Sequence, residues 1–150
     1  MRETLFNWLG QDLTGRRCLD LFAGSGALGM EAASRGASEV VMVEKDRAVF
    51  NALKQNADKL KLHNVSLRNE DGLNFASRAT AQFDVIFLDP PFKSDYLPKL
   101  LPLLAKQLTE DGFLYVESGG SFDAGEGWQI HKQGKAGAVH YQLLQYGHHD

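Results

Sequence analysis

Apolar residues recur along the chain in two alternating patterns. Short, nearly continuous apolar runs have the length of buried strands, whereas longer segments with an apolar residue every three or four positions are typical of amphipathic helices. The pattern predicts strands at residues 17–22, 40–44, 65–68, 83–88, 113–117, 128–132 and 139–145. It predicts helices at residues 2–9, 27–35, 46–60, 71–77 and 96–108.

Residues that favour turns and helix ends lie at the boundaries of these segments. Gly36 follows the second predicted helix as a C-terminal stop, and Asp46 precedes the third as an N-cap. Pro98 and Pro102 must kink the last helix or delay its start. The two final strands are joined through Gly134 and Gly137, which predicts a hairpin.

This alternation of strands and helices indicates the fold class. Near-continuous apolar strands separated by helices favour an α/β protein with a doubly wound, mostly parallel sheet covered by helices on both faces. The final hairpin would add antiparallel pairing at one edge. Because no linker, repeat or low-complexity segment interrupts the pattern, we expect residues 1–150 to form one domain.

Composition excludes several classes of protein. With 43% hydrophobic residues, the chain can bury a globular core, yet no apolar run approaches the roughly 20 residues of a membrane span. The single cysteine, Cys18, lies in a predicted buried strand and indicates a reducing cytoplasm. The net charge of −3 argues against a partner held by bulk electrostatics, although a local basic rim would remain compatible with it.

The loop after the first strand carries the first candidate chemistry. Gly24, Gly26 and Gly29 match the G-x-G-x-x-G pattern between a strand and a helix, which is typical of a nucleotide-type cofactor site. Such glycines can also serve only to pack the two elements closely. Asp20 sharpens the interpretation, because a nearby carboxylate would repel a pyrophosphate but suits the positive sulfonium and amino groups of S-adenosylmethionine.

Two further acids follow the next two strands. Glu44 ends its strand where an acidic side chain can accept hydrogen bonds from both ribose hydroxyls, so it indicates a nucleoside ligand without choosing between cofactors. Asp71 could accept a hydrogen bond from the adenine amino group, or it could only cap the helix that follows. The two interpretations of Asp71 are about equally supported by the sequence.

The turn Asp89-Pro90-Pro91-Phe92 follows the fourth strand, which a doubly wound sheet places beside the glycine loop. An exocyclic base amine is a poor nucleophile, and accepting its two hydrogen bonds returns electron density to nitrogen. Asp89 and the carbonyl of Pro90 can supply those acceptors, and Phe92 can stack on a flipped-out base. A purely structural Pro-Pro turn is the alternative.

These motifs together resemble a known family. The segment Asp20 to Gly29, then Glu44, then Asp89 to Phe92, resembles the class I methyltransferases that act on amino groups of bases. The opening Arg-Glu-Thr-Leu-Phe-Asn-Trp-Leu and the later Tyr-Val-Glu-Ser narrow the resemblance to the RsmD family of bacteria, which methylates guanine N2 at position 966 of 16S rRNA. We therefore expect a Rossmann-like S-adenosylmethionine-dependent enzyme, with 16S rRNA as its partner, free or in a partly assembled small subunit.

The candidate residues divide into two groups. The predicted cofactor-binding residues are Asp20, Phe22, Gly24, Ser25, Gly26, Glu44 and Asp71. The predicted catalytic residues are Asp89, Pro90 and Phe92. The five histidines show no metal-binding spacing, so no metal is expected. RsmD-like proteins also carry a basic extension before the opening segment, and its absence here predicts weak RNA affinity.

The sequence alone leaves three alternative functions open. An adenine-N6 or cytosine-N4 methyltransferase acting on DNA or another RNA would use the same Asp-Pro-Pro-aromatic turn. An NAD-dependent oxidoreductase would use the glycine loop, although Asp20 and the lack of an obvious hydride-transfer acid oppose it. A non-catalytic RNA-binding module would keep the fold but would have no need of the turn at Asp89.

Overall fold

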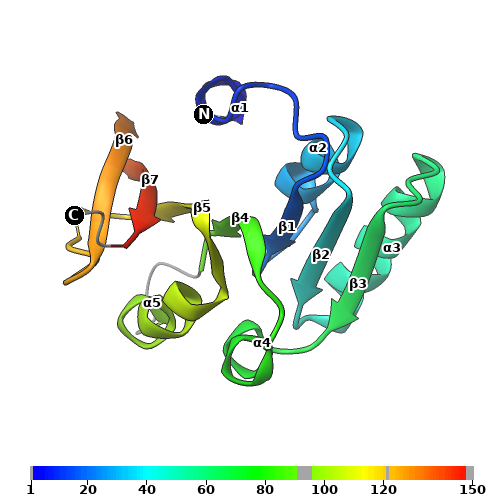
Figure 1. Ribbon diagram of the computed structural model, residues 1–150. Coiled ribbons are helices and arrows are strands. Elements are labelled where there is room, and N and C mark those ends of the chain that lie inside the picture. The colour runs from blue at the N-terminus through cyan, green and yellow to red at the C-terminus, as the bar shows by residue number, and fades with distance from the viewer. Residues whose placement is uncertain (1, 91–95, 121, 148–150) are drawn as a thin grey trace.

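The computed structural model describes residues 2–90, 96–120 and 122–147, and within them the chain alternates between strands and helices as predicted (Figure 1). The strands are β1 Arg17–Asp20, β2 Glu39–Glu44, β3 Val65–Asn69, β4 Phe83–Leu88, β5 Leu108–Ser118, β6 Trp128–Ala136 and β7 Val139–Tyr146. The helices are α1 Arg2–Trp8, α2 Ala27–Ser34, α3 Arg47–Lys59, α4 Gly72–Arg78 and α5 Tyr96–Gln107.

All the strands belong to one sheet, in the order β3-β2-β1-β4-β5-β7-β6. Neighbours from β3 to β5 pair in parallel, whereas β7 pairs antiparallel with both β5 and β6. The predicted doubly wound sheet with a C-terminal antiparallel hairpin is therefore confirmed. The order reverses between β1 and β4, and ligands of such sheets bind at the carboxyl ends of the strands beside that reversal.

Helices cover both faces of the sheet. Alternate residues of each strand point to opposite faces, so both faces have apolar side chains that pack against helices. Helices α1, α2 and α3 share one core cluster with Cys18, Met42 and Phe87 of the strands. Helices α4 and α5 share the other with Leu19 and Ile86. Each central strand thus has side chains buried on both faces of the sheet, which explains its continuous apolar sequence.

Caps and turns fix the ends of several elements. Asp46 caps α3 as predicted, because its carboxylate accepts a hydrogen bond from the Val49 amide at 3.0 Å. The β6–β7 hairpin differs from the prediction, since Gly134 lies inside β6 rather than in the connection. Its lack of a side chain makes room for the Tyr141 ring across the hairpin. The two-residue turn consists of Gly137 and Ala138, and Gly137 has a φ of 61°.

Strand β5 also begins earlier than its apolar run predicts. Leu108 already pairs with Phe83 of β4, directly after α5 ends, and the register shifts between Phe83 and Val85. Gly112 lies at this irregularity, where an added Cβ would come within 3.0 Å of the Asp84 carbonyl oxygen. The polar residues of this bulged segment conceal its strand conformation in the sequence.

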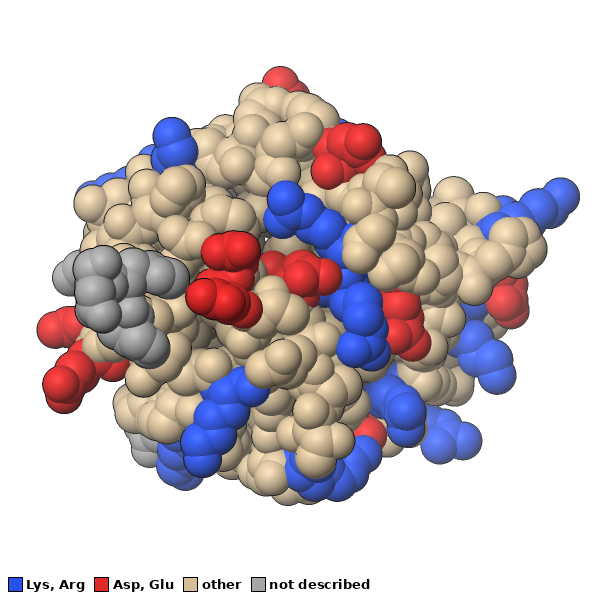
Figure 2. Space-filling view, in the orientation of Figure 1, with Lys and Arg blue, Asp and Glu red and all other residues tan. Residues whose placement is uncertain are grey.

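Charges of both signs are interspersed on the face shown in Figure 2. Because Lys and Arg side chains alternate there with Asp and Glu side chains, this face does not present a single-sign field. In the described part of the chain, none of the helices combines the length and the apolar character that crossing a bilayer would need.

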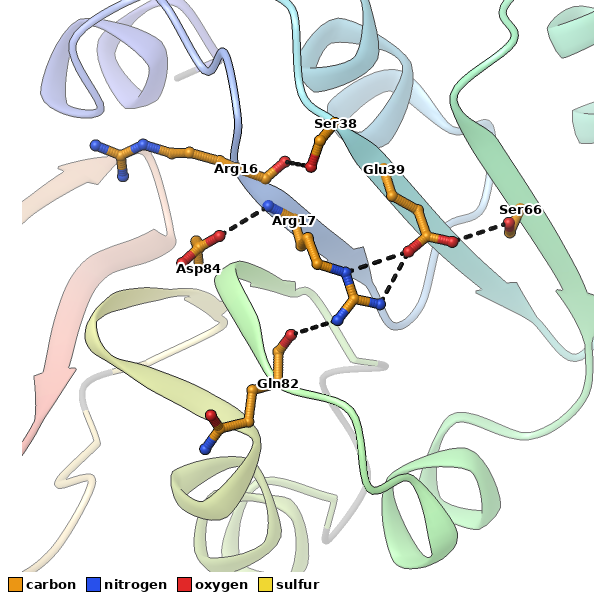
Figure 3. A network of polar contacts seen from close by, with 7 residues as sticks. All are labelled: Arg16, Arg17, Ser38, Glu39, Ser66, Gln82 and Asp84. Atoms are coloured by element: carbon orange, nitrogen blue, oxygen red, sulfur yellow. Dashed lines mark hydrogen bonds and ion pairs between the residues drawn. The ribbon is translucent and has the colours of Figure 1, made fainter.

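A polar network joins the amino-terminal ends of the central strands, opposite the ends that carry the candidate site (Figure 3). The Arg17 amide donates to Asp84 at 2.9 Å, and Thr109 donates to the other oxygen of the same carboxylate at 3.0 Å. The Arg17 guanidinium donates to Glu39 at 2.9 and 3.2 Å and to the Gln82 carbonyl at 3.0 Å. These contacts fix β1 between β2 and β4 and so align the opposite ends of the strands.

Two substitutions in this network should differ in cost. Asp84→Ala leaves a partly buried backbone amide without its acceptor, so we expect a loss of about 1–3 kcal/mol in the free energy of unfolding. Glu39→Ala removes a partner whose side chain is 38% exposed, and should cost less than about 1 kcal/mol. Urea unfolding of the two variants measures both values. An equal or larger loss for Glu39→Ala would contradict this account of the network.

Candidate active site

A cavity of about 660 Å³ lies at the carboxyl ends of the strands, beside the reversal in strand order. Its walls come from the segments that follow β1, β2, β3 and β4, together with the start of α5. The lining residues among those described are Leu21, Phe22, Gly24, Glu44, Lys45, Asp46, Asp71, Gly72, Asp89, Pro90 and Tyr96. Residues from five separate segments of the sequence thus meet around one space.

The glycine turn between β1 and α2 forms the wall on the β1 side. Gly24 and Gly26 have φ values of 56° and 85°, a region that side-chain-bearing residues rarely adopt. A Cβ on Gly26 would also lie 2.3 Å from Leu53 of α3, and one on Gly29 would lie 2.5 Å from the Met42 sulfur. The turn therefore needs its glycines both for its backbone conformation and for the close packing of α2. Gly26 serves the packing and does not line the cavity.

Glu44 holds the turn in place from β2. Its carboxylate accepts one hydrogen bond from the Gly24 amide at 2.9 Å and another from the Asp46 amide at 2.8 Å. The side chain is half-buried and lines the cavity. A carboxylate has about four acceptor positions, so two backbone donors leave capacity for hydroxyl groups of a ligand.

Asp20 lies behind the turn, and only 4% of its surface is exposed. One carboxylate oxygen accepts a hydrogen bond from the Gly29 amide at 3.0 Å. Burial raises the pKa of Asp20 to about 7, the Gly29 hydrogen bond opposes that shift, and the charges of Asp89 and Glu44 add to it. Asp20 is not among the residues that line the 660 Å³ cavity; it lines a second, smaller cavity described below.

Asp71 caps the helix that follows it and also borders the larger cavity, where its predicted contact with adenine stays a prediction. One carboxylate oxygen accepts the Asn74 amide at 3.2 Å and caps α4, while the side chain also lines the larger cavity. The Tyr96 hydroxyl lies 3.5 Å from the other oxygen. The rings of Phe22 and Tyr96 are 5.2 Å apart, so the same wall also offers an aromatic surface.

The second cavity, of about 350 Å³, lies on the other side of the glycine turn. Its lining residues among those described are Arg2, Asp20, Phe22, Ala23, Gly24, Ser25, Ala27, Leu28, Asp89 and Glu117. Phe22, Gly24 and Asp89 border both cavities, and we call these three shared residues the junction.

Asp89 occupies this junction at the end of β4. Its side chain reaches the surface, but partial desolvation and the neighbouring Glu117 charge raise its pKa to about 6. Pro90 is buried and lines the larger cavity. Phe92, which was predicted to stack on a base, lies outside the described residues.

Glu117, Tyr96 and Arg2 also border the cavities, although the sequence did not predict them as site residues. Glu117 carried a usable signal, since it is an acid at the carboxyl end of a strand like Glu44 and Asp89. Tyr96 and Arg2 belong to helices, and their position at the site follows only from how those helices pack. In the part of the chain that the structure describes, no group of three or more His, Cys, Asp and Glu residues is placed to hold a metal ion.

Comparisons with known proteins show which family the chain belongs to. A family model described as conserved hypothetical protein 95 matches residues 1–145. The chain is 39% identical over 150 residues to the ribosomal RNA small subunit methyltransferase D of Escherichia coli K12, covering 97% of this chain and 76% of that protein. The corresponding enzyme of Haemophilus influenzae is 39% identical over 153 residues, with 97% and 79% covered.

Two solved structures have the same fold along nearly the whole chain. The candidate methyltransferase yhhF of Escherichia coli superposes with a TM-score of 0.91 at 38% identity, covering 99% of this chain and 86% of that one. The candidate methylase HI0767 of Haemophilus influenzae gives 0.86 at 38% identity, with 97% and 95% covered. The fold is that of a Rossmann-like methyltransferase. Within that class, the chain belongs to the family of the small-subunit rRNA methyltransferases D, the RsmD family.

The buried Asp20 should make the stability of the protein depend on pH. Because folding raises its pKa from 3.8 to about 7, the folded state binds the proton more tightly, and stability is lost as the pH rises from about 4 through about 7. Asp20→Asn cannot lose a proton and its amide oxygen can still accept from Gly29. We therefore compare the stability gain of Asp20→Asn over the wild type, measured as the difference in free energy of unfolding. We expect this gain to be larger at pH 8 than at pH 5, by roughly 1–3 kcal/mol.

Urea unfolding at the two pH values measures this difference. Asp58→Asn, an exposed change of the same kind on α3, is the matched control and should follow the wild type. Parallel pH profiles for the wild type and Asp20→Asn would contradict the assignment of a buried, destabilising carboxylate.

Proposed function

We propose that the protein transfers a methyl group from S-adenosylmethionine to the exocyclic N2 amine of a guanine in 16S rRNA, at position 966. The observation that carries this proposal is the position of Asp89, which borders both cavities at the edge of the glycine turn. One cavity can then hold the methyl donor and the other the acceptor base, with a carboxylate where the two meet. The names of the relatives, small subunit rRNA methyltransferases, support the choice of RNA.

The larger cavity fits the methyl donor in size and chemistry. Its volume of about 660 Å³ lies in the usual range for small-molecule sites. Glu44 is already fixed by two backbone amides and can accept the ribose hydroxyls. Asp71 can accept from the adenine amino group, beside the rings of Phe22 and Tyr96. A Cβ on Gly24 would meet nothing within 4 Å, so the ligand can approach this backbone closely.

The charge of the site favours a cationic ligand over a pyrophosphate. Burial is the main cause of the raised pKa of Asp20, and the negative charges of Asp89 and Glu44 raise it further. A dinucleotide would add two negative charges to this region, whereas the sulfonium and amino groups of S-adenosylmethionine would neutralise part of it. This argument, together with membership of a methyltransferase family, disfavours the NAD-dependent alternative.

Asp89 would act on the acceptor amine. S-adenosylmethionine would supply the electrophilic methyl group and would leave as S-adenosylhomocysteine when its sulfur–methyl bond breaks. Asp89 accepts one N–H of the amine, and the carbonyl of Pro90 accepts the other, so the nitrogen lone pair becomes available for the methyl carbon. With a pKa of about 6, Asp89 is mostly ionised above pH 7 and can then take the proton that the methylated nitrogen gives up.

Replacing Glu44 tests the donor site. Glu44→Ala should weaken binding of S-adenosylhomocysteine by about 1.5–3 kcal/mol, because a charged hydrogen-bond acceptor is lost. Isothermal calorimetry measures this change, and the wild type should show no comparable heat with NAD. Glu39→Ala, also on β2 but at its opposite end, should bind normally. Unchanged binding by Glu44→Ala would contradict the ribose assignment.

Replacing Asp89 tests the chemistry. Asp89→Ala should keep most of its affinity for S-adenosylhomocysteine while the single-turnover rate of methyl transfer falls by ~10²–10³, since one preorganised partner of the transition state is lost. If Asp89 is only a structural residue, melting temperature and cofactor affinity should fall together with the rate. A folded, cofactor-binding Asp89→Ala variant with near-normal rate would exclude a catalytic role.

A further inference from the structure

A second carboxylate stands beside Asp89 at the end of the neighbouring strand. Leu88 of β4 pairs in register with Val116 of β5, so the residues that follow them, Asp89 and Glu117, are also side by side. Both line the 350 Å³ cavity, and the Glu117 charge contributes to the raised pKa of Asp89. Besides Asp20 behind the glycine turn, the proposed base cavity therefore contains two carboxylates, Asp89 and Glu117, that lie side by side at the ends of neighbouring strands.

Glu117 is held in position by Tyr115, two residues earlier in β5. The Tyr115 hydroxyl donates to one carboxylate oxygen of Glu117 at 2.8 Å, and the Tyr115 ring is fully buried between α1 and the sheet. Burial and the Glu117 charge raise the pKa of Tyr115, so the hydroxyl keeps its proton and remains a donor. Among the described residues, the other oxygen of Glu117 accepts no protein hydrogen bond.

We propose that Glu117 selects guanine by accepting the N1–H of the base while Asp89 accepts its N2 amine. This inference rests on the proposed function and adds the residue that chooses the base. Guanine presents N1–H and N2–H as adjacent donors, so it matches two adjacent carboxylates. Adenine and cytosine place an unprotonated ring nitrogen beside their amines, and its lone pair would face the Glu117 carboxylate.

The energetic consequence is a penalty on the wrong base. A site built around a substrate donor is left with an unpaired, partly desolvated charge when the donor is absent, and such sites discriminate strongly. The Asp-Pro-Pro turn alone serves any exocyclic amine, so it gives no preference between guanine N2, adenine N6 and cytosine N4. Glu117 would supply that preference.

The test uses two synthetic RNA hairpins with the 16S sequence around the target, one carrying guanosine and the other 2-aminopurine. 2-Aminopurine keeps the reacting amine but has a lone pair at N1. The wild type should use the guanosine RNA at least about 50-fold more efficiently, measured as kcat/KM. Glu117→Gln can still accept from Tyr115, yet its amide N–H can donate to N1 of 2-aminopurine. We expect Glu117→Gln to use guanosine RNA less well and 2-aminopurine RNA better than the wild type does. The ratio of kcat/KM for guanosine RNA to that for 2-aminopurine RNA should then fall about 10-fold or more.

Glu110→Gln, an exposed change of the same kind near the start of β5, is the matched control and should keep the wild-type ratio. Equal use of the two RNAs by the wild type, or an unchanged ratio in a folded Glu117→Gln that binds S-adenosylhomocysteine, would overturn the role of Glu117 alone. A wild type that binds S-adenosylhomocysteine but methylates neither these RNAs nor the rRNA of small subunits that lack the modification would contradict the proposed function and this inference with it.

Discussion

The glycine turn between β1 and α2 is held by two carboxylates, and the geometry of the site depends on this arrangement. Glu44 accepts from the Gly24 amide at one end of the turn, and Asp20 accepts from the Gly29 amide behind it. These hydrogen bonds fix the wall that divides the larger cavity from the smaller one. Because β1 lies between β2 and β4, the same turn also sets where Asp89 stands relative to both spaces. The Arg17 network at the opposite ends of these strands keeps them aligned.

The same carboxylates carry an electrostatic cost. Asp20 is buried with acids nearby, and its raised pKa shows that the folded protein holds its charge unfavourably. Functional sites commonly keep such unfavourable features, and replacing them stabilises the protein while impairing its activity. In our proposal a cationic methyl donor relieves part of this cost, and the donor groups of guanine satisfy Asp89 and Glu117. The acidic site and the net negative charge of the chain are then compatible with an RNA substrate.

Much of the fold could be predicted because local signals agreed with it. The continuous apolar strands identified the double-sided sheet, and Asp46 marked the start of α3 correctly. The predicted strand bounds were wrong where tertiary contacts determine the structure. Gly134 lies inside β6 because it makes room for the Tyr141 ring, and β5 begins early with a bulged segment. Spacing placed Asp20, Glu44, Asp71 and Asp89 at the site. It could not show that Asp20 lies behind the turn, or that strand register brings Glu117 beside Asp89.

The most direct test of the central claim identifies the methylated nucleoside. Small ribosomal subunits from cells that lack this activity would be incubated with the protein and S-adenosylmethionine carrying an isotopically labelled methyl group, and the rRNA digested and analysed by mass spectrometry. Our account predicts labelled N2-methylguanosine at position 966 of 16S rRNA, and none with Asp89→Ala. Label in N6-methyladenosine or N4-methylcytosine, or equal label with the variant, would contradict it.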